Sequence, residues 1–182
     1  MLLRRTGQVR QFWSWVNFVF NRVDHSRVAA VGPDRAAAEW VLRLGGSVKF
    51  TDMEYWNTDY NRLPSGGVKL EQIDGSGMSI TSNGLEHLGI GSFKGLACLR
   101  VLKLSRCKYL YDDGLVHLSQ VEDTLRELDL SHCPGITHKA LAYLSILGSL
   151  QKLDLTDTPG IRDRDHKLNE LNIQLPQCKI TA

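Results

Sequence analysis

The sequence predicts a mixed α/β fold in which short strands and helices alternate in tandem units. One pattern occurs three times between Leu99 and Ile161, in which two leucines separated by one residue precede a small residue and a second apolar stretch. The leucine pairs are Leu102 and Leu104, Leu128 and Leu130, and Leu153 and Leu155. The second leucines of these pairs lie 26 and then 25 positions apart, so the period is nearly constant.

A period of this length with the order L-x-L-x-x-C/T is typical of leucine-rich repeats, in which each unit is a strand, a tight turn and a helix. One unit cannot bury its own apolar face, so the units stack into a curved solenoid. Residues 68–80 are an irregular first unit, and residues 175–180 are a closing half-unit. We therefore expect a solenoid of about four repeats, of the cysteine-containing type because Cys107 and Cys133 share one slot.

The outward strand positions of these units would form one face, on which solenoids often bind partners. They are Gln72, Asp74, Val101, Lys103, Ser105, Glu127, Asp129, Ser131, Lys152, Asp154 and Thr156. The charges on this face are mixed. The alternative is a solvated face that only keeps the protein soluble.

Composition restricts the class of protein. The 182 residues suit one domain, or a small domain that caps a larger one. The formal net charge of +2 does not indicate a nucleic-acid partner, and no apolar run approaches the roughly 20 residues that span a bilayer. The four cysteines form no CxxC pair and fit no zinc spacing, so we expect free thiols in a reducing compartment.

Residues 1–11 carry Arg4, Arg5 and Arg10, and the first acidic residue of the chain is Asp24. An arginine-bearing, acid-free start is typical of a mitochondrial targeting segment or the remnant of one. An ordinary disordered terminus is the alternative.

Residues 12–23 form an aromatic segment with helical spacing. Its candidate contact residues are Phe12, Trp13, Trp15, Phe18 and Arg22. Tryptophan and flanking arginine favour a membrane interface, so contact with a membrane or a subunit is one interpretation. A self-association surface and a helix packed on the N-terminal domain are the alternatives.

The rest of the N-terminal part has clear boundaries. Pro33 and Asp34 suit the first turn of a helix that extends to Leu44, and the two glycines that follow end it. We expect a strand over residues 47–50 and a helical turn through residues 56–63, where Trp56, Tyr60 and Leu63 have helical spacing. The Pro-Ser-Gly-Gly sequence at 64–67 reads as a linker. It separates a small N-terminal helical domain, 12–66, from a leucine-rich-repeat domain, 67–182.

Five segments resemble one known family. They are FWSWVNFVFNRVD, VGPDRAAAEWVLRLGGSVKF, YWNTDYNRLPSG, LEQIDGSGMSI and KLSRCKYLYDDGL. These segments are similar to mitochondrial coupling factor B, the s subunit associated with ATP synthase, from about Phe12 to the C-terminus. The paralogous assembly factor for the distal membrane arm of respiratory complex I is the nearest competitor. The repeats alone resemble F-box-type adaptors, although no segment reads as an F-box module.

The resemblance implies a non-enzymatic, peripheral protein on the matrix side of the mitochondrial inner membrane. It implies contact with the membrane sector of ATP synthase, support of proton conduction and coupling by blocking a proton leak, and a capacity to form homo-oligomers. The alternatives are a complex I assembly factor and, from another class, a substrate adaptor for ubiquitin ligation. The residues agree with a non-enzymatic protein, since no phosphate loop follows a strand and no nucleophile motif occurs. The histidines are scattered, and His87 and His117 share a slot that we expect on the helix surface.

The resemblance also implies one Mg²⁺, held at a glycine that ends a helix and at a hydroxyl residue after an Ile-Asp pair. The matching residues are Gly45, through its carbonyl, and Ser76, which replaces the expected threonine. Mg²⁺ takes oxygen ligands and keeps several waters, so two protein oxygens suit a weak site. In the alternative, Gly45 only ends a helix and Ser76 only forms a turn.

The family's redox-sensitive dithiol corresponds here to Ser105, Arg106 and Cys107, so one thiol is missing. Arg106 and Lys108 flank Cys107 and favour its thiolate, which makes Cys107 a candidate reactive thiol. An inert turn cysteine is the alternative, because Cys133 repeats the slot.

Overall fold

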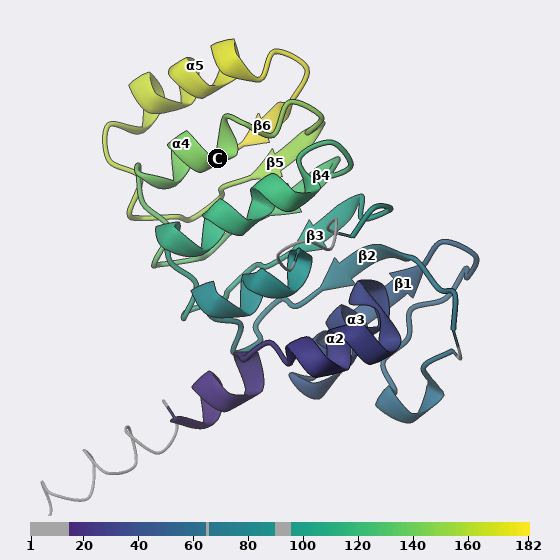
Figure 1. Cartoon of the computed structure of the whole chain (residues 1–182). Coiled ribbons are helices and arrows are strands. Elements are labelled where there is room, and N and C mark those ends of the chain that lie inside the picture. Colours follow the sequence, from purple (N-terminus) through teal and green to yellow (C-terminus); the bar gives the residue numbers. More distant parts are fainter. Residues whose placement is uncertain (1–14, 65, 90–95) are drawn as a thin grey trace, which may run out of the picture.

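The computed structural model of the chain describes residues 15–64, 66–89 and 96–182 (Figure 1). Residues 15–21 are helical. The elements that follow are α2 (His25–Val31), α3 (Pro33–Arg43), β1 (Ser47–Phe50), η1 (Tyr60–Arg62), β2 (Leu70–Asp74), η2 (Ser82–Leu88), β3 (Val101–Lys103), η3 (Asp112–Val121), β4 (Glu127–Asp129), α4 (Ala140–Leu144), β5 (Lys152–Asp154), α5 (Arg164–Gln174) and β6 (Lys179–Thr181). Elements labelled η are 3₁₀ helices.

The strands form one six-stranded sheet in chain order. β1 pairs antiparallel with β2, and every later pair is parallel. The register places Ile73, Leu102, Leu128, Leu153 and Ile180 side by side. The periodic leucines therefore lie on successive strands, as the sequence predicts.

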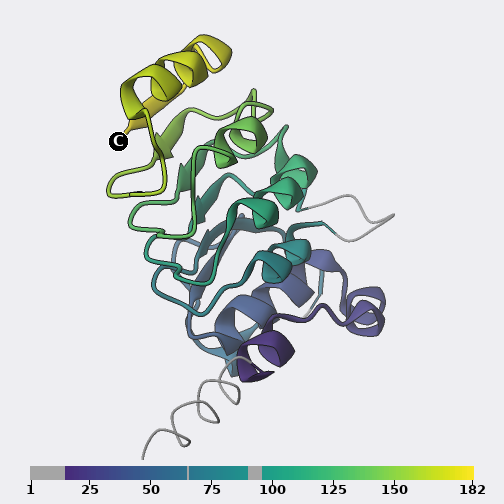
Figure 2. The ribbon, with the colours of Figure 1, turned by 90° about the vertical axis from the view of Figure 1, so that its left-hand side faces the viewer.

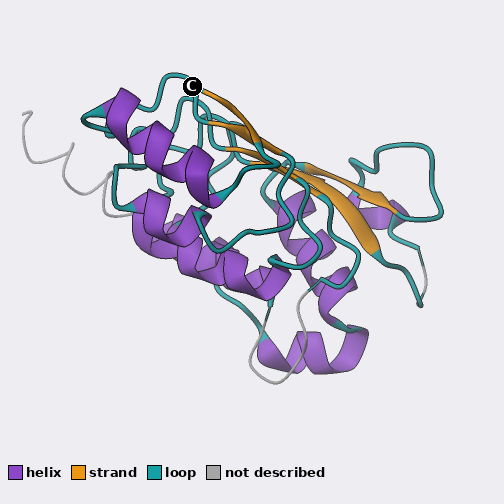
Figure 3. Ribbon diagram, turned by 90° about the horizontal axis from the view of Figure 1, so that it is seen from above, coloured by secondary structure: helices purple, strands orange, loops and turns teal. Residues whose placement is uncertain are grey.

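The helices cover one face of this sheet, and the other face is left open (Figure 3). The units stack from the N-terminal elements to α5 at the opposite end (Figure 2). The buried leucines of η2, η3 and α4 join those of the strands in one apolar core, because each unit alone would leave its inner face in water. The described part of the chain is thus a mixed α/β structure with its helices on one side of a single sheet.

Each of the strands β2 to β5 is followed by the same left-handed turn. Residues with positive φ recur at Gly77, Arg106, His132 and Asp157, one in each successive unit. Only the first is a glycine, so the other three adopt a backbone conformation that side chains usually avoid. The repeat thus includes a turn geometry as well as the leucines.

The predicted N-terminal elements are largely present. α3 begins with Pro33 at its first position and ends before Gly45, whose φ of 90° favours glycine. β1 has the predicted bounds. The predicted turn at 56–63 is only the 3₁₀ helix η1, because the backbone of Asn57 instead bonds to Val48 beside β1.

The boundary at residues 64–67 stays a prediction. β1, which precedes it, is hydrogen-bonded to β2, which follows it. The carboxylate of Asp34, at the start of α3, also accepts hydrogen bonds from the Leu70 N–H at 2.9 Å and from Lys69 Nζ at 3.0 Å. The two predicted domains therefore share one sheet.

Candidate functional site

The helical residues 15–21 present a large apolar surface to solvent. Trp15 is 62% exposed, Phe18 is 56% exposed, and Val19 and Phe20 are nearly half exposed. Arg22, just after the helix, is also exposed. Of the five predicted contact residues, Trp15, Phe18 and Arg22 therefore lie together at the surface, whereas Phe12 and Trp13 lie outside the described residues.

Exposed aromatic side chains at this density mark interaction surfaces, because a monomer gains nothing by leaving them in water. The segment lies at the end of the molecule opposite α5 (Figure 1). In the described part of the chain, no helix is both long enough and apolar enough to cross a bilayer. The geometry fits contact at a surface, with the polar side of the segment turned inward.

Asn17 and Asn21 make that inward side, and sequence analysis missed both. Asn21 is 1% exposed, and its side chain bonds to the backbone of residues 79 and 81. Two asparagines one helical turn apart, inside an otherwise apolar run, are the signal that would have found them. The Asn21 side chain fastens the segment to the first repeat unit, and the Asn17 carbonyl accepts its remaining hydrogen bond.

The open face of the sheet is a second candidate surface. A groove of about 280 Å³ crosses it, and the lining includes Lys103, Glu127, Asp129, Lys152 and Asp154. Part of the charge is already paired, since Lys152 Nζ lies 2.6 Å from a Glu127 oxygen. A second cation, Lys103, lies 5.9 Å from the ring centre of Trp56, which comes from the segment after β1. Partner binding on this face stays a prediction.

Two residues predicted on the open face are buried instead. Ser105 and Ser131 are each 6% exposed, and the Ser131 hydroxyl lies 2.8 Å from that of Ser105. At the turn after each strand, these side chains point into the stack and contact each other. They hold neighbouring units together and do not contribute to a binding face.

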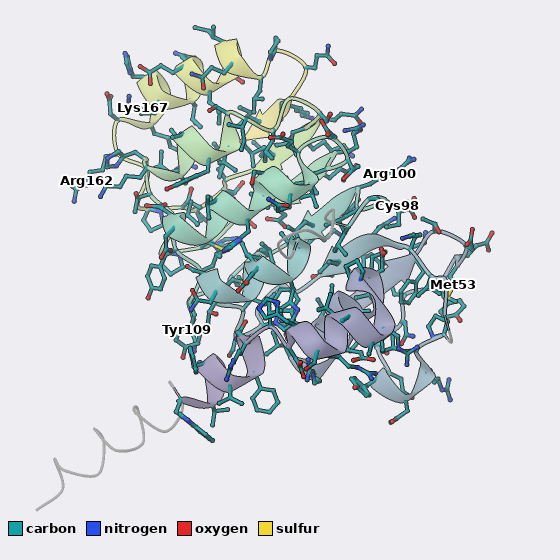
Figure 4. All side chains as sticks on the ribbon, in the orientation of Figure 1. Met53, Cys98, Arg100, Tyr109, Arg162 and Lys167 are labelled. Carbon is teal, nitrogen blue, oxygen red and sulfur yellow. The ribbon has the colours of Figure 1, made fainter. Side chains whose placement is uncertain are left out.

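The structure argues against Cys107 as a reactive thiol. Cys107 is fully buried, and its Sγ lies 3.3 Å from the Gly75 carbonyl oxygen, to which the thiol donates. Burial raises the pKa of the Cys107 thiol to about 12, so it stays protonated. The flanking charges do not offset that cost. Cys133 is buried in the same way in the next unit and bonds to the Leu104 carbonyl. Cys98, in contrast, is half-buried near the surface, on the same side as Arg100 (Figure 4).

The sequence predicts His87 on the helix surface, but the structure buries it. It is 3% exposed, and its ring stacks on Trp40 with the centroids 4.7 Å apart. Burial lowers the pKa of His87 to about 4, and the charge of Arg43 adds to this, so the ring is neutral near pH 7. α3 packs over η2 and covers this slot, whereas His117 in the next unit remains partly exposed.

Gly45 and the turn that contains Ser76 are close in space. A Cβ built on Gly45 would lie 3.4 Å from Met78 Sδ, and one on Gly46 would lie 2.7 Å from the Asp74 carbonyl. The carboxylate of Asp74 accepts a hydrogen bond from the Ser76 N–H at 3.0 Å. The carbonyl and carboxylate oxygens of Asp74 thus lie at this corner, and oxygen is the ligand atom that a hard cation prefers. Within residues 15–64, 66–89 and 96–182, no group of three His, Cys, Asp or Glu side chains is placed to hold a metal.

Comparison with known proteins identifies relatives along nearly the whole chain. The leucine-rich repeat family model matches residues 123–145, which include β4 and α4. The human protein called ATP synthase subunit s, mitochondrial, is 38% identical over 177 residues, which cover 94% of this chain and 86% of that protein. The proteins of the same name from Rattus norvegicus and Bos taurus are 38% and 36% identical over the same shares.

Proposed function

This chain belongs to the family of mitochondrial ATP synthase subunit s, and from that premise we propose that it is an accessory protein of that complex in mitochondria. The observation that assigns this proposed function to a site is the exposed aromatic face of residues 15–20. An accessory protein needs a contact surface, and the exposed side chains of Trp15, Phe18 and Phe20 supply one.

The proposed mechanism is binding, with no chemistry of its own. The protein attaches peripherally at the matrix side of the inner membrane, to the membrane sector of ATP synthase. Trp15 and Phe18 enter the interface, and Arg22 pairs with an acidic group or a lipid phosphate at its edge. By covering that region the protein blocks a proton leak and so supports coupling. Self-association is part of the same proposal.

The architecture that supports this role is a solenoid of about four repeats. The in-register strands and the recurring left-handed turns support it. Such a stack gives the aromatic segment a rigid base at one end and leaves the open face of the sheet for a second contact.

We also propose a weak Mg²⁺ site at Gly45 and Ser76. The carbonyl of Gly45 and the hydroxyl or carbonyl of Ser76 would hold the ion, with Asp74 beside them. The Asp74 oxygens described above are ligand atoms of the kind that Mg²⁺ prefers. The ion would supply a crosslink between the end of α3 and the first repeat. Calorimetric titration with Mg²⁺ should show binding that weakens in Ser76→Ala; no heat in the wild type would reject the site.

The main test is affinity purification of the tagged protein from mitochondria in mild detergent, followed by mass spectrometry. Wild type should recover ATP synthase subunits, and a variant with Trp15→Ser and Phe18→Ser should lose them. Ile173→Ser is the matched control, because Ile173 is 80% exposed but lies on α5 at the opposite end. It should recover as much as the wild type.

Other recoveries would decide against the proposal. Complex I membrane-arm subunits in place of ATP synthase would move the protein to an assembly role. Loss of ATP synthase in the Ile173 control as well would remove the aromatic segment as the specific contact.

A further inference from the structure

We propose that Asn21 is a positioning residue, which fixes the direction of the aromatic contact segment (residues 15–20) by occupying the place of a preceding repeat at the start of the stack. The inference rests on the proposed function, because it concerns how that contact is presented. It adds a residue outside the contact surface whose side chain decides where the surface points.

Asn21 joins the segment to the first repeat unit across a long stretch of chain. Its Nδ2 donates to the Ser79 carbonyl at 2.8 Å, and its Oδ1 accepts from the Thr81 N–H at 3.1 Å. These partners are 58 and 60 positions away in the sequence. The other Nδ2 hydrogen bonds to the Asn17 carbonyl at 2.8 Å, one turn back in the same helix. A buried amide with its hydrogen-bonding groups satisfied is costly to remove.

Gly84 leaves the space that this amide occupies. A Cβ at Gly84 would lie 2.3 Å from Asn21 Oδ1 and 3.0 Å from Trp40 Cζ2. The amide therefore sits in a cradle that exists because residue 84 has no side chain.

The same slot in the next unit shows what the amide replaces. Gly84 precedes Leu85 as Gly114 precedes Leu115, and a Cβ at Gly114 would lie 2.7 Å from the Cα of Ser82. Ser82 is the first residue of η2, in the preceding unit. Its hydroxyl accepts from the Tyr111 N–H at 3.1 Å, much as Asn21 Oδ1 accepts from Thr81. Among the described residues no repeat helix precedes η2, and Asn21 takes the position that Ser82 has in the next unit.

This placement controls the exposed aromatics. Residues 22–24 are not helical, so the segment would otherwise pivot about them. Asn21 holds one side of the helix inward, which turns Trp15 and Phe18 toward solvent in a fixed direction. A surface that is already oriented loses less conformational entropy when it binds.

The test compares Asn21→Ala, Gly84→Ala, and the two together. Gly84→Ala leaves Asn21 in the chain but displaces its amide, because the new Cβ would lie 2.3 Å from Asn21 Oδ1. Gly148→Ala is the matched control, because a Cβ there meets no atom within 4 Å. The first readout is amide hydrogen exchange on the free protein, and the second is recovery of ATP synthase subunits.

The exchange rate of the Thr81 amide should rise about tenfold in Asn21→Ala and in Gly84→Ala, and the double variant should add little. Amides of β4 should exchange as in the wild type and in Gly148→Ala. Recovery of ATP synthase should fall several-fold in both single variants. In the Trp15→Ser, Phe18→Ser background, Asn21→Ala should lower recovery no further, because Asn21 acts through those side chains.

Unchanged exchange at Thr81 would overturn the positioning role, and so would faster exchange with undiminished recovery. A further fall in recovery when Asn21→Ala is added to the aromatic variant would also overturn it, because Asn21 would then act by another route. If the wild type recovers no ATP synthase, the proposed function fails, while the exchange result still reports whether Asn21 fastens the segment.

Discussion

The repeat units from β2 to β6 and the N-terminal elements from residue 15 to β1 are held together by different kinds of contact. In the repeats the same contacts recur. Aspartates near the ends of the strands accept from the N–H two residues on, at 3.0 Å for Asp74, 2.9 Å for Asp129 and 2.8 Å for Asp154. The leucines of neighbouring strands stack in register.

The N-terminal elements use contacts that occur once. Glu39 in α3 is 2% exposed and lies 2.6 Å from the Arg27 guanidinium and 3.1 Å from that of Arg35. The hydrogen bonds from Arg27 hold the pKa of the Glu39 carboxyl below its ordinary value. Asn21, the Asp34 carboxylate and the stack of His87 on Trp40 are likewise single.

This contrast shows which substitutions should destabilise each part. Repeated contacts spread stability over many similar side chains, and the leucine core carries most of it. Single contacts concentrate stability in a few polar groups, whose loss leaves a buried partner unsatisfied. Substitutions, a change of pH and thiol alkylation test this contrast, in decreasing order of effect.

Leu104→Ala should cost the most. Leu104 is fully buried in the core of the stack, so truncation leaves a cavity and should lower the free energy of unfolding by about 2–5 kcal/mol. Urea titration followed by circular dichroism measures this. Val116→Ala is the control, because Val116 is 47% exposed and should change stability by less than about 0.5 kcal/mol. Equal losses in the two variants would contradict a leucine core.

Asp34→Ala should cost about 1.5–3 kcal/mol, because it strands the buried Leu70 N–H and removes the charge paired with Lys69. Asp34→Asn should cost less, since the amide oxygen can still accept from Leu70. The same urea titration ranks the two. If Asp34→Asn lowers the free energy of unfolding as much as Asp34→Ala, the hydrogen bond from the Leu70 N–H is not the main stabilising contact of Asp34.

His87 should make stability depend on pH in mildly acidic solution. Its pKa in the folded protein is about 4, whereas an unfolded chain takes up the proton near pH 6.5. The unfolded state therefore binds more protons between these values, and stability falls as the pH falls. At pH 5.5 the expected loss relative to pH 7.5 is about 1.4 kcal/mol.

Unfolding free energies of the wild type and His87→Phe, measured from pH 7.5 to 5, test this prediction. The phenyl ring keeps the stack on Trp40 and does not titrate, so its profile should be flatter by that amount. Parallel profiles would show that His87 titrates in the folded protein as it does in the unfolded chain.

Trp15→Ser with Phe18→Ser should leave stability within about 0.5 kcal/mol of the wild type, because both side chains are exposed. Thermal unfolding checks this. A large loss would mean that these residues pack against the protein and are not available for a contact.

Cys107 should show no reaction at all in the folded protein. With a pKa of about 12 and no exposure, it should resist iodoacetamide at pH 8 while the half-buried Cys98 is alkylated. Mass spectrometry of peptides cleaved only after lysine reads both sites, because Cys98 then lies in residues 95–103 and Cys107 in residues 104–108. Alkylation of Cys107 at the rate of Cys98 would restore the reactive-thiol interpretation.

The amino-acid sequence alone predicts the strands at the periodic leucines, the bounds of β1, and the start and end of α3. It also identifies the aromatic segment as a candidate contact surface. These follow from local rules. Leucine spacing shows which residues share a buried face, and Pro33 and Gly45 mark the ends of a helix because of their own backbone preferences.

The tertiary fold alone shows that His87 and Cys107 are buried, and that the hydroxyls of Ser105 and Ser131 are hydrogen-bonded beneath the open face. It also decided the role of Asn21, whose partners lie about 60 positions away. Burial of a polar group depends on which distant element packs over it. The spacing of residues along one segment carries no record of that, so His87 and His117 share a repeat slot and yet differ in exposure.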